Sequence, residues 1–324
     1  MADARYDILG IGNAIVDVLA RADDAFLDRH DMRKGGMTLI DAEQAGRIYA
    51  AMPPAQEASG GSAANTCAVA AMLGARVAFI GKVADDQLGG VFAHDIRAGG
   101  VAFDTPPLDN GAPTARCLIL VTGDGQRTMN TFLGACVALG EGDVDAALVG
   151  DAKVTYLEGY LFDPPAAQAA FRKAAAAARA AGRKVALTLS DPFCVHRHRD
   201  AFRALVREDV DILFANEAEI AALYEAEFDA AAEAVRAEVA IAALTRSEQG
   251  SMVVAGGETV RVEAAPAKVV DTTGAGDAYA AGFLAAWARG EGLAACGALG
   301  SRAAAAAISQ MGARPASLRS PVAN

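Results

Sequence analysis

The chain has 324 residues, of which 53% are hydrophobic and 21% are charged. This composition supports a substantial buried core and excludes a disordered or collagen-like chain. With 29 basic and 40 acidic side chains the net charge is −11, which argues against a broad basic surface for nucleic acid. At about 150 residues per domain, the length allows one large α/β domain or two ordinary ones.

The sequence contains no signal for export or membrane insertion. Its first residues lack a basic segment followed by a long apolar run, and no run of about 18 uncharged apolar residues occurs elsewhere. The five cysteines are odd in number and contain no C-x-x-C pair, so neither a disulfide framework nor a structural zinc site is predicted. We therefore expect a cytoplasmic protein with free thiols.

Short β-like runs alternate with helical runs along most of the chain. Strands are predicted at 7–12, 77–83, 154–157, 184–189, 211–214 and 240–244, and helices at 63–73, 88–98, 166–181, 217–224, 275–288 and 293–309. This alternation predicts a mainly parallel sheet covered by helices on both faces, in a single domain spanning 1–324. The alanine-rich stretch 174–181 is expected to be an exposed or weakly packed helix.

Two segments, at about 14–42 and 112–132, depart from this alternation. Both contain β-like pieces without a long helix between them, which fits strands that leave the main sheet and form a small second layer. Ligands of open parallel sheets bind beyond the carboxyl ends of the strands, so such a layer can act as a lid. Ordinary surface hairpins are the alternative.

Two local patterns are rejected as functional motifs. Gly10 and Gly12 follow the first strand, but Ile15 stands where a dinucleotide-binding fingerprint needs its third glycine. This mismatch argues against a dehydrogenase. His196 and His198 are two positions apart and have no acidic partner assigned to them, and we expect them in a solvated loop rather than a metal site.

The segment VVDTTGAGDAYAAGF at 269–283 carries the clearest chemical signal. Gly274-Ala275-Gly276 opens a long helix of small residues, with Asp277 in its first turn. Glycines allow close approach to a ligand, and the free N–H groups at a helix start bind anions. Asp277 beside a bound phosphoryl group can accept a proton from an attacking hydroxyl. The alternative is a capping role for Asp277.

This stretch resembles the second signature of the ribokinase-like (PfkB) family of carbohydrate and nucleoside kinases. GGSAAN at 60–65, GKVADDQLG at 81–89 and the N-x-x-E element at 216–219 match further family elements in the same order. The resemblance extends from about residue 6 to residue 315. It implies a ribokinase-like three-layer α/β/α sandwich with a mainly parallel central sheet, a small β-sheet lid, and ATP with Mg²⁺ as cofactors.

The resemblance also implies roles for individual residues. Asp277 corresponds to the catalytic base, and the GAG backbone before it corresponds to the anion hole. Asn216 and Glu219 are implied to organise Mg²⁺ through its waters; by itself, Glu219 would be assigned to a solvated helix face. Many relatives use K⁺ near the anion hole, where Asp271 and Thr273 are implied to supply oxygens.

Further nucleotide contacts are implied near the end of the chain. Thr245 and Gly250, in TRSEQG, match a nucleotide-binding strand-to-loop element, although the family often has a glycine where this chain has Ser247. The helix and loop at 303–312 are implied to flank the adenine of ATP.

A ribose clamp is predicted in the amino-terminal half. Asp17 follows the first strand and is expected at a strand's carboxyl end, where its carboxylate can accept two hydrogen bonds from a vicinal diol. Asn65, at the start of a helix and just after Gly60-Gly61, can both donate and accept. A helix N-cap is the alternative role for Asn65.

Within the family, residues 26–39 and 212–217 resemble corresponding segments of the adenosine kinases. SDPF at 190–193 resembles the segment that places an aromatic ring against the acceptor purine, which makes Phe193 a stacking candidate; the alternative is a core position. Leu161 stands where these enzymes often have another aromatic residue, which weakens the purine assignment.

The resemblance thus implies an ATP-dependent kinase, acting in purine salvage on the 5′-hydroxyl of adenosine to give AMP and ADP. Inosine, guanosine or a sugar such as ribose or fructose are alternative acceptors, and a non-catalytic nucleoside-binding sensor is a more distant alternative. No nucleic-acid or membrane partner is expected, and the sequence is compatible with a monomer or a homodimer.

Overall fold

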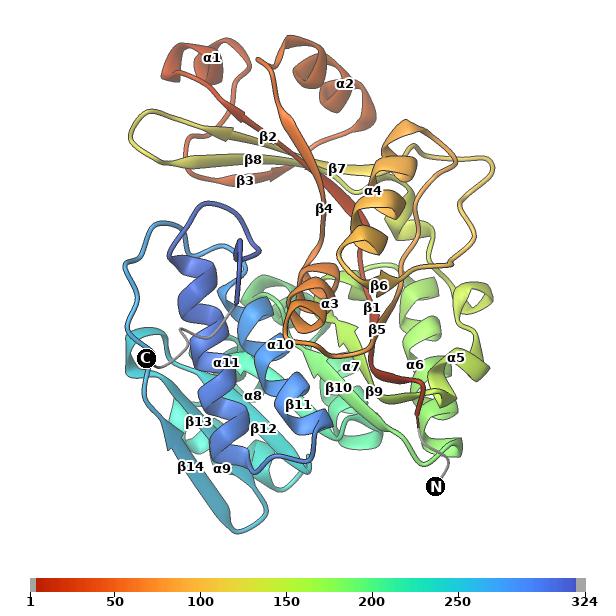
Figure 1. The fold of residues 1–324 in the computed structure, drawn as a ribbon, viewed down its shortest axis with the longest axis vertical. Coiled ribbons are helices and arrows are strands. Elements are labelled where there is room, and N and C mark those ends of the chain that lie inside the picture. Colours follow the sequence, from red (N-terminus) through yellow and green to blue (C-terminus); the bar gives the residue numbers. More distant parts are fainter. Residues whose placement is uncertain (1–3, 319–324) are drawn as a thin grey trace.

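The computed structural model describes residues 4–318 and contains a large sheet and a smaller one (Figure 1). The large sheet has the order β14 (Glu258–Val262), β13 (Ser251–Ala255), β12 (Ile241–Thr245), β11 (Ile212–Asn216), β10 (Lys184–Thr188), β9 (Ala152–Glu158), β1 (Tyr6–Ile11), β5 (Val77–Ile80), β6 (Val101–Ala102). The strands from β12 to β6 pair in parallel, whereas β13 pairs antiparallel with both of its neighbours, β12 and β14. This sheet confirms the predicted fold class.

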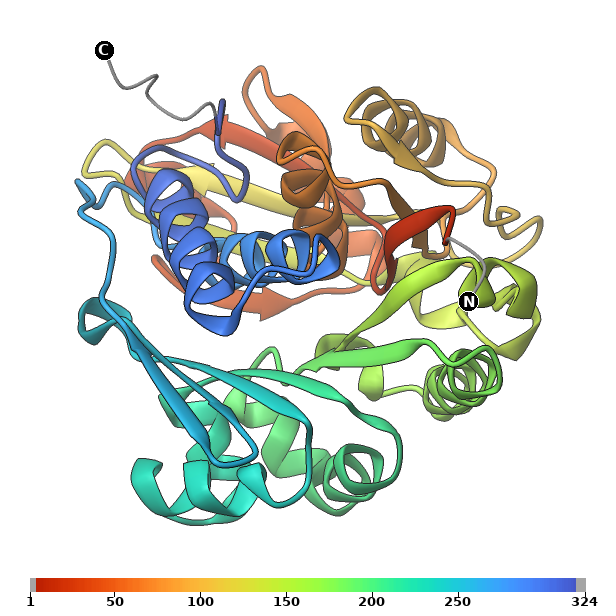
Figure 2. The same cartoon turned by 60° about the horizontal axis from the view of Figure 1, so that its bottom comes forward.

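Helices cover both faces of the large sheet, because successive strand residues point to opposite faces. Ile8 is buried in one cluster with α3, α4, α10 and α11, whereas Leu9 and Ile11 are buried in another with α5 to α9. The helices of the first face are α3 (Ser62–Met72), α4 (Gln87–Ala98), α10 (Ala275–Ala288) and α11 (Leu293–Ile308); those of the second are α5 (Ala146–Gly150), α6 (Pro165–Ala180), α7 (Pro192–Asp209), α8 (Glu217–Tyr224) and α9 (Phe228–Arg236). Figure 2 shows α10 and α11, in blue, on one side and the green and teal helices on the other.

The smaller sheet lies at one end of the molecule beside α1 (Asp24–Arg29) and α2 (Ala42–Ala51) (Figure 1). Its order is β3 (Met37–Leu39), β8 (Arg127–Phe132), β7 (Ala115–Val121), β2 (Ile15–Arg21), β4 (Gln56–Gly60). Strands β2 and β3 come from the first irregular segment, and β7 and β8 from the second. Strand β4 was not predicted, because QEASG has no alternation of apolar residues. It leads directly into α3, and so joins the two sheets.

The alanine-rich end of α6 is more deeply packed than expected. Ala174, Ala175 and Ala178 are at most 1% exposed and belong to the core beneath the sheet. Their spacing places them on one face of the helix, and their small side chains allow close approach to the strands. The expectation of an exposed or weakly packed helix was therefore wrong.

The two histidines expected in a solvated loop lie instead in α7, which is kinked at His198. The helix starts at Asp191, whose side chain accepts hydrogen bonds from the first backbone N–H groups. His198 Nε2 lies 2.7 Å from a carboxylate oxygen of Asp163, and Arg197 pairs with the same residue at 3.0 Å. Asp163 lies far from the two histidines in the sequence, so the sequence did not reveal this acidic partner.

Two further expectations concern the cysteines and membrane insertion. All five cysteines are free and buried. Within residues 4–318, no helix combines the length and the apolar character needed to cross a membrane.

Candidate active site

The predicted anion-binding helix begins as the sequence indicated. Gly274 is the N-cap of α10 and has a φ of +74°; a Cβ there would lie 2.4 Å from the backbone oxygen of Ala313, so only glycine fits. Gly276 is exposed, and no atom of residues 4–318 lies within 4 Å of the place where its Cβ would be. No described side chain caps the helix, although the Ala275 N–H donates to the backbone oxygen of Thr272 at 3.3 Å. An anion at this end would be bound by the N–H groups that follow it in the first turn.

Asp277 lies in the first turn of α10 and faces the start of α3. The Ser62 hydroxyl donates to its Oδ1 at 2.6 Å, and the Asn65 amide also interacts with the carboxylate. Burial raises the pKa of Asp277 to about 6, against the opposing effect of these two groups. At neutral pH the carboxylate is mainly ionised and can accept a proton.

The residues of the predicted ribose clamp lie in the smaller sheet and at the start of α3. Asp17 lies within β2 of the smaller sheet, opposite Ala58 and Cys117, so the expectation of a strand's carboxyl end was wrong. Gly60 lies against it, because a Cβ on Gly60 would be 2.5 Å from the Asp17 carboxyl carbon. Burial raises the pKa of Asp17 to about 6. The structure thus brings Asp17 and Gly60 together.

Helix α3, like α10, starts at a glycine with a positive φ. Gly61 is its N-cap with a φ of +100°, and a Cβ there would lie 2.1 Å from the backbone oxygen of Asn13. Asn65 is the fourth residue of the helix and is 6% exposed, so it is not the N-cap considered as an alternative. Its side chain is engaged inside the site, because its Oδ1 accepts a hydrogen bond from Arg314 and its amide interacts with Asp277.

A buried carboxylate that the sequence analysis missed anchors this region. Glu158, at the end of β9, accepts hydrogen bonds from the Asn13 amide at 2.6 Å and from the backbone N–H of Ala63 at 2.8 Å. It is 1% exposed, and burial raises its pKa to about 7. Glu158 holds the start of α3 against the large sheet and so fixes the side of the site that carries Ser62.

Two arginines of the site were also missed. Arg314 follows α11, and its Nε donates to Asn65 Oδ1 at 2.8 Å. Arg127, at the start of β8, forms a buried ion pair with Asp271. The loop that carries Arg314 lies between α11 and the smaller sheet (Figure 1). Neither contact has a sequence signal, because each joins residues more than 140 positions apart.

Asn216 and Glu219 form a reciprocal capping box at the start of α8. The Asn216 backbone N–H and side-chain amide donate to the two oxygens of Glu219 at 2.9 and 2.7 Å. Glu219 is 6% exposed, so it does not belong to a solvated helix face. Burial raises its pKa to about 7. Both oxygens of Glu219 are engaged within the capping box.

The segment after β12 contains a short 3-10 turn, Ser247–Gln249, and leads into β13. Thr245 ends β12 and lies opposite Asn216 of β11. The two residues, both predicted to contact the nucleotide, are therefore neighbours. Gly250 has a φ of +81° and Ser247 a φ of +50°. The positive φ at Ser247 explains physically why a glycine suits this position.

The aromatic residues differ from the expectation. Leu161 is 1% exposed and lies in the core, whereas its neighbour Tyr160 is 44% exposed. Partial burial together with the carboxylates of Asp191 and Asp277 raises the pKa of Tyr160. Phe193 is 74% exposed, which excludes the core alternative.

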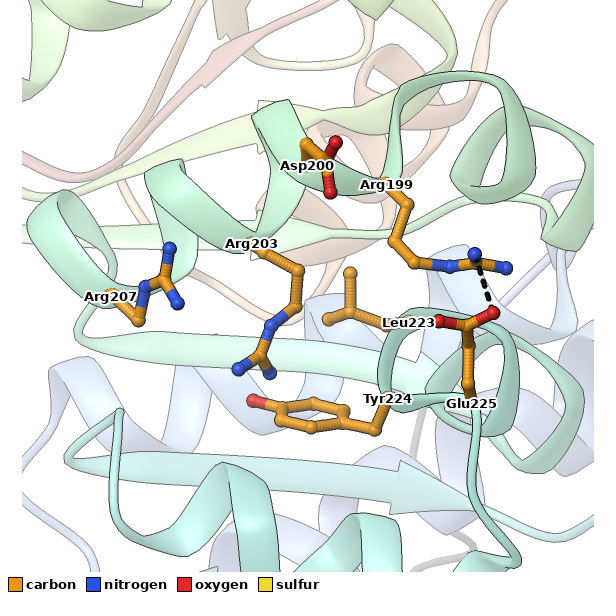
Figure 3. A pocket seen from close by; sticks show the side chains of 7 residues that line it. All are labelled: Arg199, Asp200, Arg203, Arg207, Leu223, Tyr224 and Glu225. Atoms are coloured by element: carbon orange, nitrogen blue, oxygen red, sulfur yellow. Dashed lines mark ion pairs between the residues drawn. The ribbon is translucent and has the colours of Figure 1, made fainter.

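A hollow of about 390 Å³ between α7 and α8 is separate from this constellation (Figure 3). Arg199 and Arg203 line it but are paired with Glu225 and Glu238 at 2.8 and 2.6 Å. None of the predicted site residues lines it. Within residues 4–318 no group of three or more His, Cys, Asp or Glu side chains is arranged to hold a metal ion.

A mainly parallel sheet, a second small sheet and an uncapped GAGD helix define the class of ribokinase-like kinases. The family described as pfkB family carbohydrate kinase matches residues 39–320, and the chain belongs to that family. It is an ATP-dependent kinase of nucleosides or sugars, and the family usually employs Mg²⁺ with ATP.

Solved structures and curated relatives cover nearly the whole chain. It is 57% identical to the adenosine kinase of Sinorhizobium meliloti, with 97% of each chain covered and a TM-score of 0.88. It is 50% identical to a probable sugar kinase of Rhizobium etli CFN 42, with 97% of this chain and 96% of that chain covered and a TM-score of 0.89. The adenosine kinase of Saccharomyces cerevisiae is 28% identical over 326 residues, covering 93% of this chain and 94% of the relative.

Proposed function

We propose that this chain transfers the γ-phosphoryl group of ATP to the 5′-hydroxyl of adenosine, giving AMP and ADP. One observation carries the proposal: Asp277, in the first turn of the uncapped helix α10, accepts a hydrogen bond from Ser62 in the first turn of α3. A carboxylate is thereby held between the predicted phosphate and acceptor sides. Adenosine as the acceptor is supported by the similarity to the kinase of Sinorhizobium meliloti.

In the proposed reaction, Asp277 takes the proton of the 5′-hydroxyl as its oxygen attacks the γ-phosphorus and ADP leaves. A pKa of about 6 suits a general base near neutral pH. The N–H groups at Gly274-Ala275-Gly276 stabilise the charge on the transferring group, because they are fixed in place before the reaction begins.

The acceptor is proposed to bind through Asp17, Gly60, Gly61 and Asn65. The Asp17 carboxylate accepts hydrogen bonds from the two ribose hydroxyls, and the absent side chain of Gly60 leaves room beside that carboxylate. Phe193 remains the predicted stacking partner of the base. Tyr160, exposed and electrostatically close to Asp277, is a second aromatic candidate that compensates for the aliphatic Leu161.

ATP is proposed to lie along the side formed by Asn216, Thr245 and Gly250. Bound with ATP, Mg²⁺ neutralises phosphate charge. Glu219 fits a role through water, since its carboxylate is already engaged by Asn216. The segment 303–312 is proposed to flank the adenine.

The smaller sheet, from about 14–42 and 112–132 with the addition of β4, is proposed to be the lid of a single domain. Met37 and Leu39 on its edge strand β3 are 56% and 59% exposed. Closure over a bound nucleoside would cover such apolar side chains and exclude water, which otherwise competes for the phosphoryl group.

A sugar kinase is the second candidate, favoured by the similarity to the probable sugar kinase of Rhizobium etli CFN 42. A steady-state panel of adenosine, inosine, guanosine, ribose and fructose with ATP and Mg²⁺ separates the two. We expect kcat/KM for adenosine to exceed that of the sugars at least about 100-fold, since a base-binding site rejects ligands that leave it empty. Faster turnover of ribose or fructose would identify a sugar kinase, and adenosine binding without any turnover would indicate a sensor.

The residues implied to bind K⁺ do not fit that ion in this structure. The Asp271 carboxylate already accepts hydrogen bonds from the Thr273 hydroxyl at 2.7 Å and the Gly312 N–H at 2.9 Å, and it pairs with Arg127. The Arg127 and Asp271 side chains are 9% and 6% exposed. The guanidinium therefore already supplies the positive charge that K⁺ would bring, and we propose that the reaction needs no K⁺.

Exchange of K⁺ for Na⁺ or choline is accordingly expected to change the wild-type kcat by no more than about twofold. In Arg127→Ala, the buried Asp271 loses its counter-charge, so a rate that rises with added K⁺ is expected. Initial rates at constant ionic strength measure both effects. Strong K⁺ activation of the wild-type enzyme would contradict the proposal.

A further inference from the structure

The guanidinium of Arg314 reaches the acceptor side of the site from the far end of the chain. Its Nε donates to Asn65 Oδ1 at 2.8 Å, and its Nη1 donates to Ser59 Oγ at 2.9 Å. Asp95 lies 3.6 Å from Nη1 and also accepts the Ser59 hydroxyl at 2.6 Å. Arg314 is therefore held by three different elements, α3, β4 and α4, although it lies in a loop.

This contact decides which way the Asn65 amide faces. An asparagine side chain presents an oxygen that accepts and an NH₂ group that donates. Because the oxygen is taken by the guanidinium, the NH₂ group is the one available to the carboxylate of Asp277, with which Asn65 interacts. The reversed amide would place donor against donor at Arg314 and oxygen against oxygen at Asp277.

The charge of Arg314 acts on the same carboxylate. Besides burial, the groups that shift the pKa of Asp277 are Ser62 and Asn65 from α3, Arg314, and Asp17 from β2. Together with burial, Asp277 in turn raises the pKa values of Tyr156 and Glu158 on β9, Tyr160 after β9 and Glu219 on α8. Among the groups that shift Asp277, the carboxylate of Asp17 favours its protonation. Arg314 opposes this effect and favours the ionised form that a base requires.

One atom of Arg314 is left without a partner. Nη2 is buried and makes no hydrogen bond within residues 4–318. A buried N–H donor without an acceptor is costly, so a bound ligand that supplies an oxygen here would be favoured.

We propose that Arg314 is a positioning residue for phosphoryl transfer: it fixes the Asn65 amide so that its NH₂ group faces Asp277, and it keeps Asp277 ionised. The proposal rests on the proposed function, in which Asp277 is the base. It adds a residue outside the predicted site motifs, supplied by the loop after α11.

The test compares Arg314→Gln and Arg314→Lys with the wild-type enzyme over pH 5–9. In Arg314→Gln the loss of the cation is expected to move the acid limb of kcat/KM upward by about one pH unit, with a kcat about fivefold lower at pH 6. Arg314→Lys keeps the positive charge, so its acid limb should stay near that of the wild type. It lacks the planar guanidinium group that holds the Asn65 amide, so kcat should still fall. Arg203→Gln, which removes another partly buried paired arginine in the hollow of Figure 3, is the matched control and should leave the limb in place.

A second measurement needs no acceptor. The carboxyl carbon shift of Asp277, identified by its absence in Asp277→Asn, reports the pKa of this residue in the ligand-free protein. Arg314→Gln should raise that pKa by about one unit. If the wild type phosphorylates no nucleoside, the proposed function fails, while this titration still tests Arg314. An unmoved pKa in a folded Arg314→Gln variant, or a full kcat in Arg314→Lys, would overturn the proposal.

Discussion

Replacing Asp277 with asparagine is expected to lower kcat for adenosine about 1,000-fold, the usual effect of losing a general base. The amide keeps the size of the side chain and can still accept the Ser62 hydroxyl, so the acceptor KM should change little. Steady-state kinetics with saturating ATP and Mg²⁺ measures both constants. Asp200→Asn on α7, which changes a carboxylate outside the site, is the matched control and should be fully active.

The same variant has an expected effect on stability, with a defined sign. In the folded protein the pKa of Asp277 is raised from its ordinary 3.8 to about 6. Folding therefore favours the neutral side chain, and the free energy of unfolding falls as the pH rises through this range and the carboxyl group ionises. The neutral asparagine avoids this loss. The Tm of Asp277→Asn should equal or exceed that of the wild type at pH 8, with a smaller difference at pH 5. Near wild-type turnover, or a large loss of Tm, would remove Asp277 from its proposed role.

Replacing Asp17 with alanine is expected to raise the acceptor KM about 100-fold, because two hydrogen bonds from the ribose diol to a charged oxygen are lost. The KM for ATP and the kcat at saturating adenosine should change by no more than a few-fold. The wild type should also discriminate against 2′- and 3′-deoxyadenosine, whereas Asp17→Ala should not.

The control for this experiment is another carboxylate of the smaller sheet. Asp124, in the turn between β7 and β8, is 52% exposed and paired with Lys34 at 2.8 Å. Asp124→Asn should leave the acceptor KM unchanged. An unchanged acceptor KM in Asp17→Ala would exclude the diol clamp, and a KM that rises equally in both variants would point to a general effect on the lid.

Local features of the site were predictable because neighbouring residues dictate them. The start of α10 at the GAG turn followed from two glycines and a run of small residues, and the structure has a glycine with positive φ there. Helix α8, with Asn216 before it and Glu219 in its first turn, was predicted at the bounds that the structure has. Their catalytic and binding roles stay predictions.

Errors arose where a local pattern was compatible with two environments. The sequence of α6 indicates a helix, but alanine is too small to show which face is buried; packing against the sheet decided that. Asp17 was assigned to a strand end, and the pairing of β2 with β4 and β7 places it in the middle of a strand.

By itself, the amino-acid sequence determined the mainly parallel sheet, six of the helices that cover it and the glycine turn at which α10 begins, since hydrophobic period and turn residues act over a few positions. The tertiary structure alone decided which charges meet there. Arg314 reaches Asn65 across 249 positions and Arg127 reaches Asp271 across 144. Such partners are selected by folding, because the cost of burying a charge is offset only by the groups that the fold brings beside it.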